Sequence, residues 1–242
     1  MMKKILVSGG EGFFAKKLIK YNTQYELYAA PKSELDVTNL SSIETVLDEF
    51  SPDIFIHSGG FTRPMVLHKT FPDKSIKINI IGTSNVVVEC MKRNIKLVYI
   101  STDYVYPRQL GMYSEDSGVY PVNKYAWSKL GGECAVMLYD NSLILRTAMC
   151  QNPFPHKEAL VDVEKSVISQ DEAAKILFDL LDNTGIINVG GPPKSMYEFI
   201  KKTNPNIKKI YLNDIKDVEM SFATMDCSRM QNILTGENDD EF

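Results

Sequence analysis

Short apolar runs alternate with longer helix-like stretches along the first 146 residues. The strand-sized runs occupy residues 5–8, 25–29, 53–57, 96–101 and 143–146. Apolar side chains recur at helical spacing between them, over residues 13–19, 42–50, 73–93 and 123–139. The run at 96–101 is almost wholly apolar, which is typical of a strand covered by helices on both faces of a parallel sheet. The alternation predicts βαβ units and an α/β fold with a doubly wound parallel sheet.

The helix expected over residues 73–93 is long, and its spacing places Ile76, Ile80, Val87 and Met91 on one buried stripe. The rhythm changes after residue 146, because residues 151–168 contain prolines and follow neither period. The elements expected beyond them are a helix at 171–181, a strand at 186–189, a short helix at 195–202 and a basic strand at 207–212.

This change of pattern suggests a division of the chain. We expect a sheet domain over residues 1–147 and a small C-terminal lobe over 148–234, with some segments of the lobe returning to the sheet domain. Residues 235–242 are acidic and poor in apolar side chains, so we expect them to be disordered.

Composition and charge narrow the classes of function. Of the 242 residues, 44% are hydrophobic and 24% are charged, an ordinary balance for a soluble globular chain. The net charge of −4 gives no general attraction for phosphate backbones, so no nucleic-acid partner is expected. The apolar runs are too short for a bilayer, so no membrane partner is expected. The first run ends at Ser8 without a small-residue cleavage site, which favours a cytoplasmic protein.

The cysteines and histidines indicate structural rather than metal-binding roles. No C-x-x-C pair occurs, and no cysteine has a histidine at metal-ligand spacing, so no metal site is expected. Cys90 and Cys134 lie in helical patterns and are expected to be buried, reduced thiols. His57 ends a strand, in the core or at the rim of a ligand site, whereas His68 and His156 are expected in exposed loops.

The turn after the first strand carries the strongest local motif. Gly9, Gly12 and Ala15 form a G-x-x-G-x-x-A pattern that leads directly into the first helix. In a dinucleotide-binding turn, glycines permit a tight bend and a close approach to pyrophosphate, and the helix N-terminus supplies N–H groups for the phosphates. We therefore predict a Rossmann-like dinucleotide site here, with a merely structural turn as the alternative.

The end of the second strand bears on the choice of cofactor. A Rossmann domain that binds NAD carries an acidic residue there for the ribose 2′-hydroxyl, but this chain has Ala29 and Ala30. Lys32 either accompanies a 2′-phosphate, which favours NADP(H) over NAD(H), or is an ordinary solvated lysine. Asp36 either reaches the adenine or caps the following helix, and the pattern leaves both open.

Tyr125 and Lys129 stand four residues apart in a predicted helix and so share one of its faces. A free tyrosine has a pKa of about 10, too high for acid–base work at neutral pH, and a neighbouring ammonium lowers that pKa by stabilising the phenolate. Ser101, Thr102 and Asp103 end the fourth strand, at the edge where open sheets bind ligands. A hydroxyl there can hold a carbonyl oxygen beside the tyrosine, while a plain surface Tyr–Lys pair is the alternative.

Together, seven sequence blocks resemble the extended short-chain dehydrogenase/reductase family and, within it, the dTDP-4-dehydrorhamnose reductases. The blocks are residues 5–13, 35–39, 52–57, 79–85, 100–106, 121–129 and 145–147. The Ser-Thr-Asp-Tyr-Val-Tyr stretch at 101–106 is particularly characteristic of these reductases. The resemblance extends from residue 3 to about residue 234 and implies a Rossmann-like domain followed by a substrate lobe.

The resemblance also implies roles for single residues. Thr102 falls on the family's catalytic hydroxyl, Tyr125 on its proton donor and Lys129 on the partner of that donor. Asn79 matches an asparagine that the family keeps near its active site. The implied cofactor-binding residues are Gly9, Gly12, Phe13, Phe14, Lys32, Asp36, Val37, Gly59, Gly60, Tyr125 and Lys129.

By the same resemblance we expect an NADP(H)-dependent oxidoreductase, with NAD(H) as the alternative cofactor, whose substrate is a nucleotide-linked 4-keto-6-deoxy sugar. A hydride would pass to C4 of the sugar while Tyr125 protonates the developing alkoxide. The alternatives are an NAD-dependent sugar-nucleotide epimerase or dehydratase, and a non-catalytic dinucleotide-binding subunit that regulates a partner. A homodimer is common in the family, but no apolar stripe decides it here.

Two departures from the family concern the substrate. Ala148, Met149 and Cys150 stand where the family commonly continues with Ser-Trp, in a stretch that lines its sugar site. Residues 151–167 are shorter than the usual substrate lobe. Either the chain accepts a smaller or less enclosed sugar, or it has lost turnover.

Overall fold

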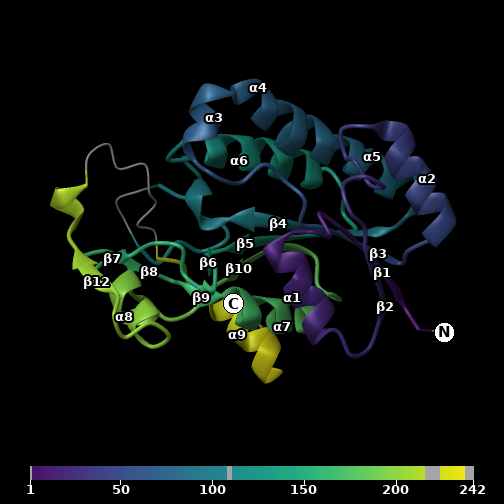
Figure 1. Ribbon diagram of the computed structural model, residues 1–242. Helices are drawn as coiled ribbons and strands as arrows, with labels where there is room; N and C mark the ends of the chain where they lie inside the picture. Colours follow the sequence, from purple (N-terminus) through teal and green to yellow (C-terminus); the bar gives the residue numbers. More distant parts are fainter. Residues whose placement is uncertain (1, 108–110, 216–223, 238–242) are drawn as a thin grey trace.

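A computed structural model describes residues 2–107, 111–215 and 224–237, with a parallel six-stranded sheet at its centre (Figure 1). The strands are β1 (Lys4–Ser8), β2 (Glu26–Ala29), β3 (Ile54–His57), β4 (Lys96–Thr102), β5 (Ser142–Thr147) and β10 (Gly185–Val189). Their order is β2-β1-β3-β4-β5-β10, and every neighbouring pair is parallel. The predicted α/β fold with a doubly wound parallel sheet is confirmed.

Helices cover both faces of this sheet. One face carries α1 (Phe13–Tyr21), α7 (Gln170–Leu180) and α9 (Ser228–Thr235), and the other carries α2 (Leu40–Phe50), α5 (Thr83–Arg93) and α6 (Lys124–Val136) (Figure 1). In β1, Ile5 and Val7 join the apolar cluster formed with α1 and α7, whereas Leu6 joins the cluster formed with α2 and α5. Burial on both faces explains the near-continuous apolar sequences of the strands.

The helix predicted over residues 73–93 contains a π-helical segment. It runs through α4 (Pro72–Ser75), the π-helix η1 (Ile76–Gly82) and α5. The predicted buried stripe is wrong at Ile76 and Met91, which are 49% and 47% exposed, and the buried face instead includes Asn79 and Cys90. A π-turn holds more residues than an α-turn, so the buried face rotates away from a 3.6-residue spacing.

Short strand pairs follow β5. β6 (Met149–Cys150) pairs with β9 (Ile168–Ser169), β7 (Glu158–Leu160) with β12 (Lys208–Ile210), and β8 (Glu164–Lys165) with β11 (Lys194–Ser195). α8 (Met196–Lys201) packs on β7, and Ala159, Val167 and Ile200 belong to a small apolar cluster there. Strands of two or three residues are too short to show a period of two, which is why the sequence there gave no readable pattern.

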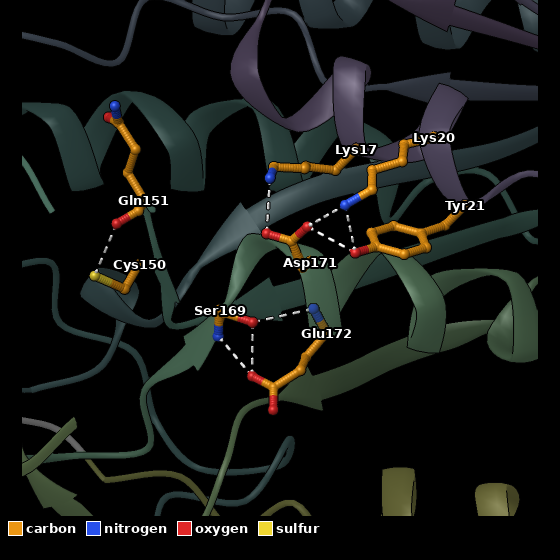
Figure 2. A network of polar contacts seen from close by, with 8 residues as sticks. All are labelled: Lys17, Lys20, Tyr21, Cys150, Gln151, Ser169, Asp171 and Glu172. Carbon is orange, nitrogen blue, oxygen red and sulfur yellow. Dashed lines mark hydrogen bonds and ion pairs between the residues drawn. The ribbon is translucent and has the colours of Figure 1, made fainter. Parts of the chain in front are cut away.

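Parts of the C-terminal region belong to the central layers. β10 pairs with β5, and α7 packs on α1. Asp171 of α7 accepts a hydrogen bond from Tyr21 and lies 2.7 Å from Lys17 Nζ, both on α1 (Figure 2). Ser169 and Glu172 form a capping box that begins α7 beside this network (Figure 2). The helix that follows the glycine turn is thus tied to a helix 150 residues later.

Two expectations about single side chains are wrong. Cys134 lies on α6 but is exposed, because the buried face of α6 runs through neighbouring positions. His68 is buried rather than exposed, because it lies on the short helix α3 (Val66–Thr70), where its Nδ1 is 2.8 Å from Ser75 Oγ and its ring packs on Phe61. The tail expected to be disordered falls mainly on residues 238–242, outside the described residues.

Candidate active site

The candidate site lies where two adjacent strands send the chain in opposite directions. β1 and β3 are neighbours, but the connection after β1 leads to β2 on one side and the connection after β3 leads to β4 on the other. Such divergence opens a crevice at the carboxyl ends of the strands. Gly9 has φ +71°, and a Cβ there would lie 2.7 Å from the Cα of Gly59, so the turns after β1 and β3 touch. Glycine at position 9 is therefore required by both its backbone conformation and the packing, whereas a Cβ at Gly59 would fit tightly, 3.1 Å from Ser8 Oγ.

A cavity of about 1010 Å³ occupies this crevice and continues toward the short strand pairs. We call the part lined by Gly9, Gly12 and Lys32 the loop end, and the part lined by Tyr125 and Lys165 the lobe end. Every site residue named from the sequence, apart from Asn79, lines the cavity: Gly9, Gly12, Phe13, Phe14, Lys32, Asp36, Val37, Gly59, Gly60, Thr102, Tyr125 and Lys129.

The loop end fits a dinucleotide phosphate. Gly12 is the N-cap of α1, so the first turn of that helix offers backbone N–H groups without intrahelical acceptors. The turn itself is tight, because a Cβ at Gly9 would meet the backbone of Gly59 at 2.7 Å and the φ of Gly9 is +71°. The residues present therefore match the requirements of a dinucleotide-binding turn.

Lys32 and Asp36 stand together at this end. Lys32 Nζ lies 3.9 Å from Asp36 Oδ2, and the lysine side chain is 70% exposed. Asp36 Oδ1 accepts hydrogen bonds from the backbone N–H and the hydroxyl of Thr38 at 2.9 and 2.8 Å. Burial raises the pKa of Asp36, but these bonds and Lys32 outweigh it and lower the pKa overall. The sequence left two roles open for Asp36, contact with the adenine or capping of the next helix. The N-cap of α2 is Asn39, so Asp36 does not cap that helix.

Thr102, Tyr125 and Lys129 converge from two elements. Thr102 is the last residue of β4, and its hydroxyl donates to Asp103 Oδ1 at 3.3 Å. Asn123 caps α6 through a 2.8 Å hydrogen bond from the N–H of Ala126, which places Tyr125 in the first helical turn and Lys129 one turn later. The strand end and the helix start therefore face one cavity.

The phenol of Tyr125 is held in its protonated form. Burial raises its pKa well above the usual range, and a hydrogen bond with Thr102 only partly offsets that effect. We expected Lys129 to lower this pKa, but the shift has the opposite direction because desolvation of the phenolate is the larger effect.

Lys129 is itself a desolvated cation. Burial lowers its pKa to about 7, and Glu133 opposes that change. Its Nζ lies 3.9 Å from the centroid of the Tyr99 ring. Glu133 also accepts hydrogen bonds from Ser101 at 2.7 Å and from Arg146 Nε at 3.0 Å, so it is fixed between α6 and the sheet.

Asn79 does not line the cavity but holds its walls together. Its Nδ2 donates to Ser128 Oγ on α6 and to the carbonyl of Phe61 after β3, each at 2.8 Å. Its Oδ1 accepts from the N–H of Phe61 at 2.7 Å. The π-helix presents this buried amide, and such segments frequently occur at functional sites.

Several residues at the lobe end were missed by sequence reasoning. Lys165 of β8 lies 2.6 Å from Asp103, and Arg63 donates to Gln151 at 2.8 Å. His68 does not line the cavity but packs edge-on against the Tyr125 ring from behind the lining, with the ring centroids 5.2 Å apart. Lys165 is buried together with Val163 and Val167, but Ser166 and Ile168 are buried as well, so no clean alternation in the sequence marks it.

Other chemistry has little support at this site. Burial raises the pKa of Cys150 to about 11, so its thiol stays protonated at neutral pH. Within residues 2–107, 111–215 and 224–237, no group of three or more metal-ligating side chains occurs. Over the same ranges, no helix is long and apolar enough to cross a membrane.

Curated relatives include an enzyme and a subunit of an enzyme. A dTDP-4-dehydrorhamnose reductase of Aggregatibacter actinomycetemcomitans is 29% identical over 152 residues, covering 61% of this chain and 51% of the relative. Methionine adenosyltransferase 2 subunit beta of Xenopus tropicalis is 28% identical over 188 residues, covering 73% of this chain and 52% of the relative. The chain spans about half the length of the curated relatives it matches.

A solved structure matches over nearly the whole chain. The dTDP-4-dehydrorhamnose reductase of Bacillus anthracis, in complex with NADP, has a TM-score of 0.86 and 25% identity, covering 98% of this chain and 94% of that one. A family model described as the RmlD substrate binding domain matches residues 2–179, which is most of the chain. The chain therefore belongs to the RmlD substrate binding domain family, in agreement with its resemblance to the dTDP-4-dehydrorhamnose reductases.

Proposed function

We propose that the chain is an NADP(H)-dependent reductase of a nucleotide-linked 4-keto-6-deoxy sugar, with NAD(H) as the alternative cofactor. The observation that carries this proposal is that Thr102, Tyr125 and Lys129 line the same cavity as the glycine turn after β1. The relatives named dTDP-4-dehydrorhamnose reductase, one of them in complex with NADP, support both the substrate class and the cofactor.

The side chains divide the work of a carbonyl reduction. A bound nicotinamide supplies the hydride. The Tyr125 O–H donates a proton to the oxygen of the former carbonyl, and its raised pKa keeps that proton available at neutral pH. Thr102 positions the carbonyl oxygen beside Tyr125, and Lys129 holds the nicotinamide ribose. A protonated phenol suits reduction, in which the donor must give a proton to an alkoxide.

Lys32 supports NADP(H) over NAD(H). Its exposed ammonium lines the loop end and can meet a 2′-phosphate, while Asp36 is held by Thr38. The cavity lining near Lys32 also includes the carboxylates of Asp36 and Glu11, so a 2′-hydroxyl has acceptors there as well. This arrangement leaves NAD(H) usable and NADP(H) favoured.

The decisive assay measures the oxidation of NADPH by a dTDP-linked 4-keto-6-deoxy sugar. The reaction is monitored as the loss of NADPH absorbance. Tyr125→Phe removes the proton donor, so we expect turnover to fall at least about 100-fold. Binding of NADPH, measured by fluorescence, should stay within about twofold because the loop end is untouched. Tyr120→Phe, at an exposed tyrosine before α6, is the matched control. Turnover by Tyr125→Phe at the level of the unsubstituted chain would refute the assignment.

A non-catalytic regulatory subunit is the second candidate. The observation in its favour is the match to methionine adenosyltransferase 2 subunit beta, which extends over more of this chain than the reductase match does. This candidate predicts binding of the dinucleotide without turnover of any 4-keto sugar. The same assay, run with the unsubstituted chain, separates the two candidates.

A further inference from the structure

A row of two buried hydroxyls and one histidine lies behind the loop end of the cavity. Ser8, the last residue of β1, stands opposite His57, the last residue of β3, in the parallel pairing of these strands. Ser8 Oγ lies 2.7 Å from His57 Nδ1, and His57 Nε2 lies 3.0 Å from Oγ1 of Thr83 on α5. All three side chains are buried, and none of them lines the cavity, although their chain neighbours Gly9 and Ser58 do.

The ring of His57 is neutral. Burial lowers its pKa to about 3, and the nearby charge of Lys129 acts in the same direction. A neutral imidazole has one N–H donor and one acceptor nitrogen, so the groups on its two sides must take opposite parts. The partners of the ring therefore decide which nitrogen carries the hydrogen.

The hydroxyl hydrogens determine that choice. The Thr83 O–H donates to the backbone carbonyl of Asn79 at 2.8 Å, so its oxygen is left to accept from His57 Nε2–H. Ser8 Oγ accepts the N–H of Gly59 at 3.1 Å, and within the described part of the chain its only other hydrogen bond is the one with His57. Because a buried hydroxyl without an acceptor is unfavourable, the single hydrogen of Ser8 points to His57 Nδ1. Each hydrogen in the row then has an acceptor.

This arrangement joins the ends of β1 and β3. The bond from the Gly59 N–H to Ser8 Oγ is one link, and the Ser58 hydroxyl adds a second by donating to the carbonyl of Ser8 at 2.7 Å. Ser58, Gly59 and Gly60 all line the cavity. His57 Nδ1 thus takes the Ser8 hydrogen and leaves the Ser8 oxygen free to accept from Gly59.

We propose that His57 is a positioning residue for dinucleotide binding: as the neutral Nε2–H tautomer it holds the Ser8 hydroxyl, so that Ser8 Oγ fixes the N–H of Gly59. The cavity-lining loop at 58–60 is thereby held against the turn after β1. The inference rests on the dinucleotide binding contained in the proposed function. Without the ring nitrogens, the Ser8 hydrogen has to find another acceptor and the bond to Gly59 weakens. Thr83 keeps its bond to the carbonyl of Asn79, so the disturbance stays at the loop end.

The test compares His57→Phe, Ser8→Ala and the double variant, with NADPH binding measured by calorimetry. His57→Phe keeps a buried ring and removes both nitrogens. We expect it to weaken NADPH binding about tenfold, which corresponds to about 1.4 kcal/mol. Its kcat in the 4-keto sugar assay should stay within about twofold. In the Ser8→Ala background, the same change should alter the affinity less than about twofold, because the hydroxyl through which His57 acts is absent.

Two spectroscopic readouts follow the row itself. Long-range ¹H–¹⁵N NMR correlations show which ring nitrogen of His57 carries the hydrogen, and the signals of this residue are those that His57→Phe removes. We expect the hydrogen on Nε2. Amide exchange reports on the loop, and the N–H of Gly59 should exchange about tenfold faster in His57→Phe because its acceptor is no longer held in place.

Phe55→Leu is the matched control, because Phe55 is a fully buried ring on the same strand and does not line the cavity. This substitution alters the packing beside His57 without touching the row of polar groups, so the affinity for NADPH should stay within about twofold. Should His57→Phe fail to fold, Ser8→Ala removes the acceptor of the Gly59 N–H and should show the tenfold loss by itself.

The outcomes are separable. The inference is overturned by a hydrogen on Nδ1, by additive losses of affinity in the double variant, or by a fall of kcat with unchanged NADPH affinity in His57→Phe. NADPH binding without turnover refutes the proposed reductase and leaves the affinities to decide the role of His57. If the unsubstituted chain binds no dinucleotide, the proposed function fails. In that case the exchange rate of Gly59 decides, and an unchanged rate in His57→Phe would show that His57 does not hold the loop.

Discussion

Lys129 is a buried charge, and its removal should stabilise the fold. The residue is 5% exposed, and burial lowers its pKa from 10.5 to about 7 while Glu133 acts in the opposite direction. Lys129→Met keeps an unbranched apolar side chain and removes the ammonium. Folding of the natural chain must desolvate the ammonium, and folding of the variant does not, so the variant should be more stable. Such gains in stability are common when a functional polar group is removed.

The pH dependence gives the size of this effect. Between pH 7 and pH 10.5 the unfolded chain holds the Lys129 proton and the folded chain does not, so unfolding takes up a proton and the stability of the unsubstituted chain rises with pH. Each pH unit in that window corresponds to about 1.4 kcal/mol. The advantage of Lys129→Met should therefore be largest below pH 7 and shrink by about 2–3 kcal/mol by pH 9.

One contact works against the variant. The ammonium lies 3.9 Å from the centroid of the Tyr99 ring, and loss of this cation–π contact subtracts about 1–2 kcal/mol from the advantage. The change of the advantage with pH is thus a cleaner measure than its absolute size.

The assay is urea unfolding followed by circular dichroism at pH 6, 7, 8 and 9 for both chains. Lys124→Met, at an exposed lysine on the same helix, is the control and should follow the unsubstituted chain at every pH. Parallel stability curves for Lys129→Met and the unsubstituted chain between pH 6 and pH 9 would show that the ammonium is not desolvated and would refute the reasoning.

Three further substitutions address the loop end and the helix that supports it. Gly9→Ala places a Cβ 2.7 Å from Gly59 Cα at a φ of +71°, so the free energy of unfolding should fall by about 1–3 kcal/mol. Calorimetry should also show weaker NADPH binding, and unchanged binding would contradict the role of the turn. Lys32→Ala should weaken NADPH binding about tenfold and spare NADH, and equal losses for both would exclude a 2′-phosphate contact. Ser169→Ala removes the cap of α7 and should cost about 1 kcal/mol in urea unfolding; no measurable loss would contradict the capping.

The periodic parts of the chain were the predictable ones. The strand at 96–101 can be predicted because both of its faces are apolar over several residues. The helix at 171–181 can be predicted because one of its faces is apolar. The π-helix at 76–82 could not be predicted in this way, because the spacing of its buried residues matches neither the 3.6-residue period of an α-helix nor the two-residue period of a strand. The burial of His68 depends on partners that lie outside its own helix, Phe61 and Tyr125, and no local pattern records them.

The site divides in the same way. Gly9, Thr102 and Tyr125 could be named in advance because each stands at a strand or helix end that the alternation locates. Lys165 could not be assigned to the site, because its meeting with Asp103 requires a two-residue strand to fold against the end of β4. The direction of the pKa shift at Tyr125 was also beyond the sequence, since it depends on how much water the folded cavity excludes.

The tie between α1 and α7 bears on how the chain matures during synthesis. Tyr21 and Asp171 meet across 150 residues, and β10, which completes the sheet beside β5, follows α7 in the chain. On the ribosome, the glycine turn therefore emerges long before the helix that braces α1. Closure over such a distance is slow and leaves apolar surface uncovered in the meantime. The glycine turn and α1 are thus synthesised first, but α1 gains its contacts with α7 late. A nascent chain that lacks α7 and β10 carries the glycine turn on a sheet that is still incomplete.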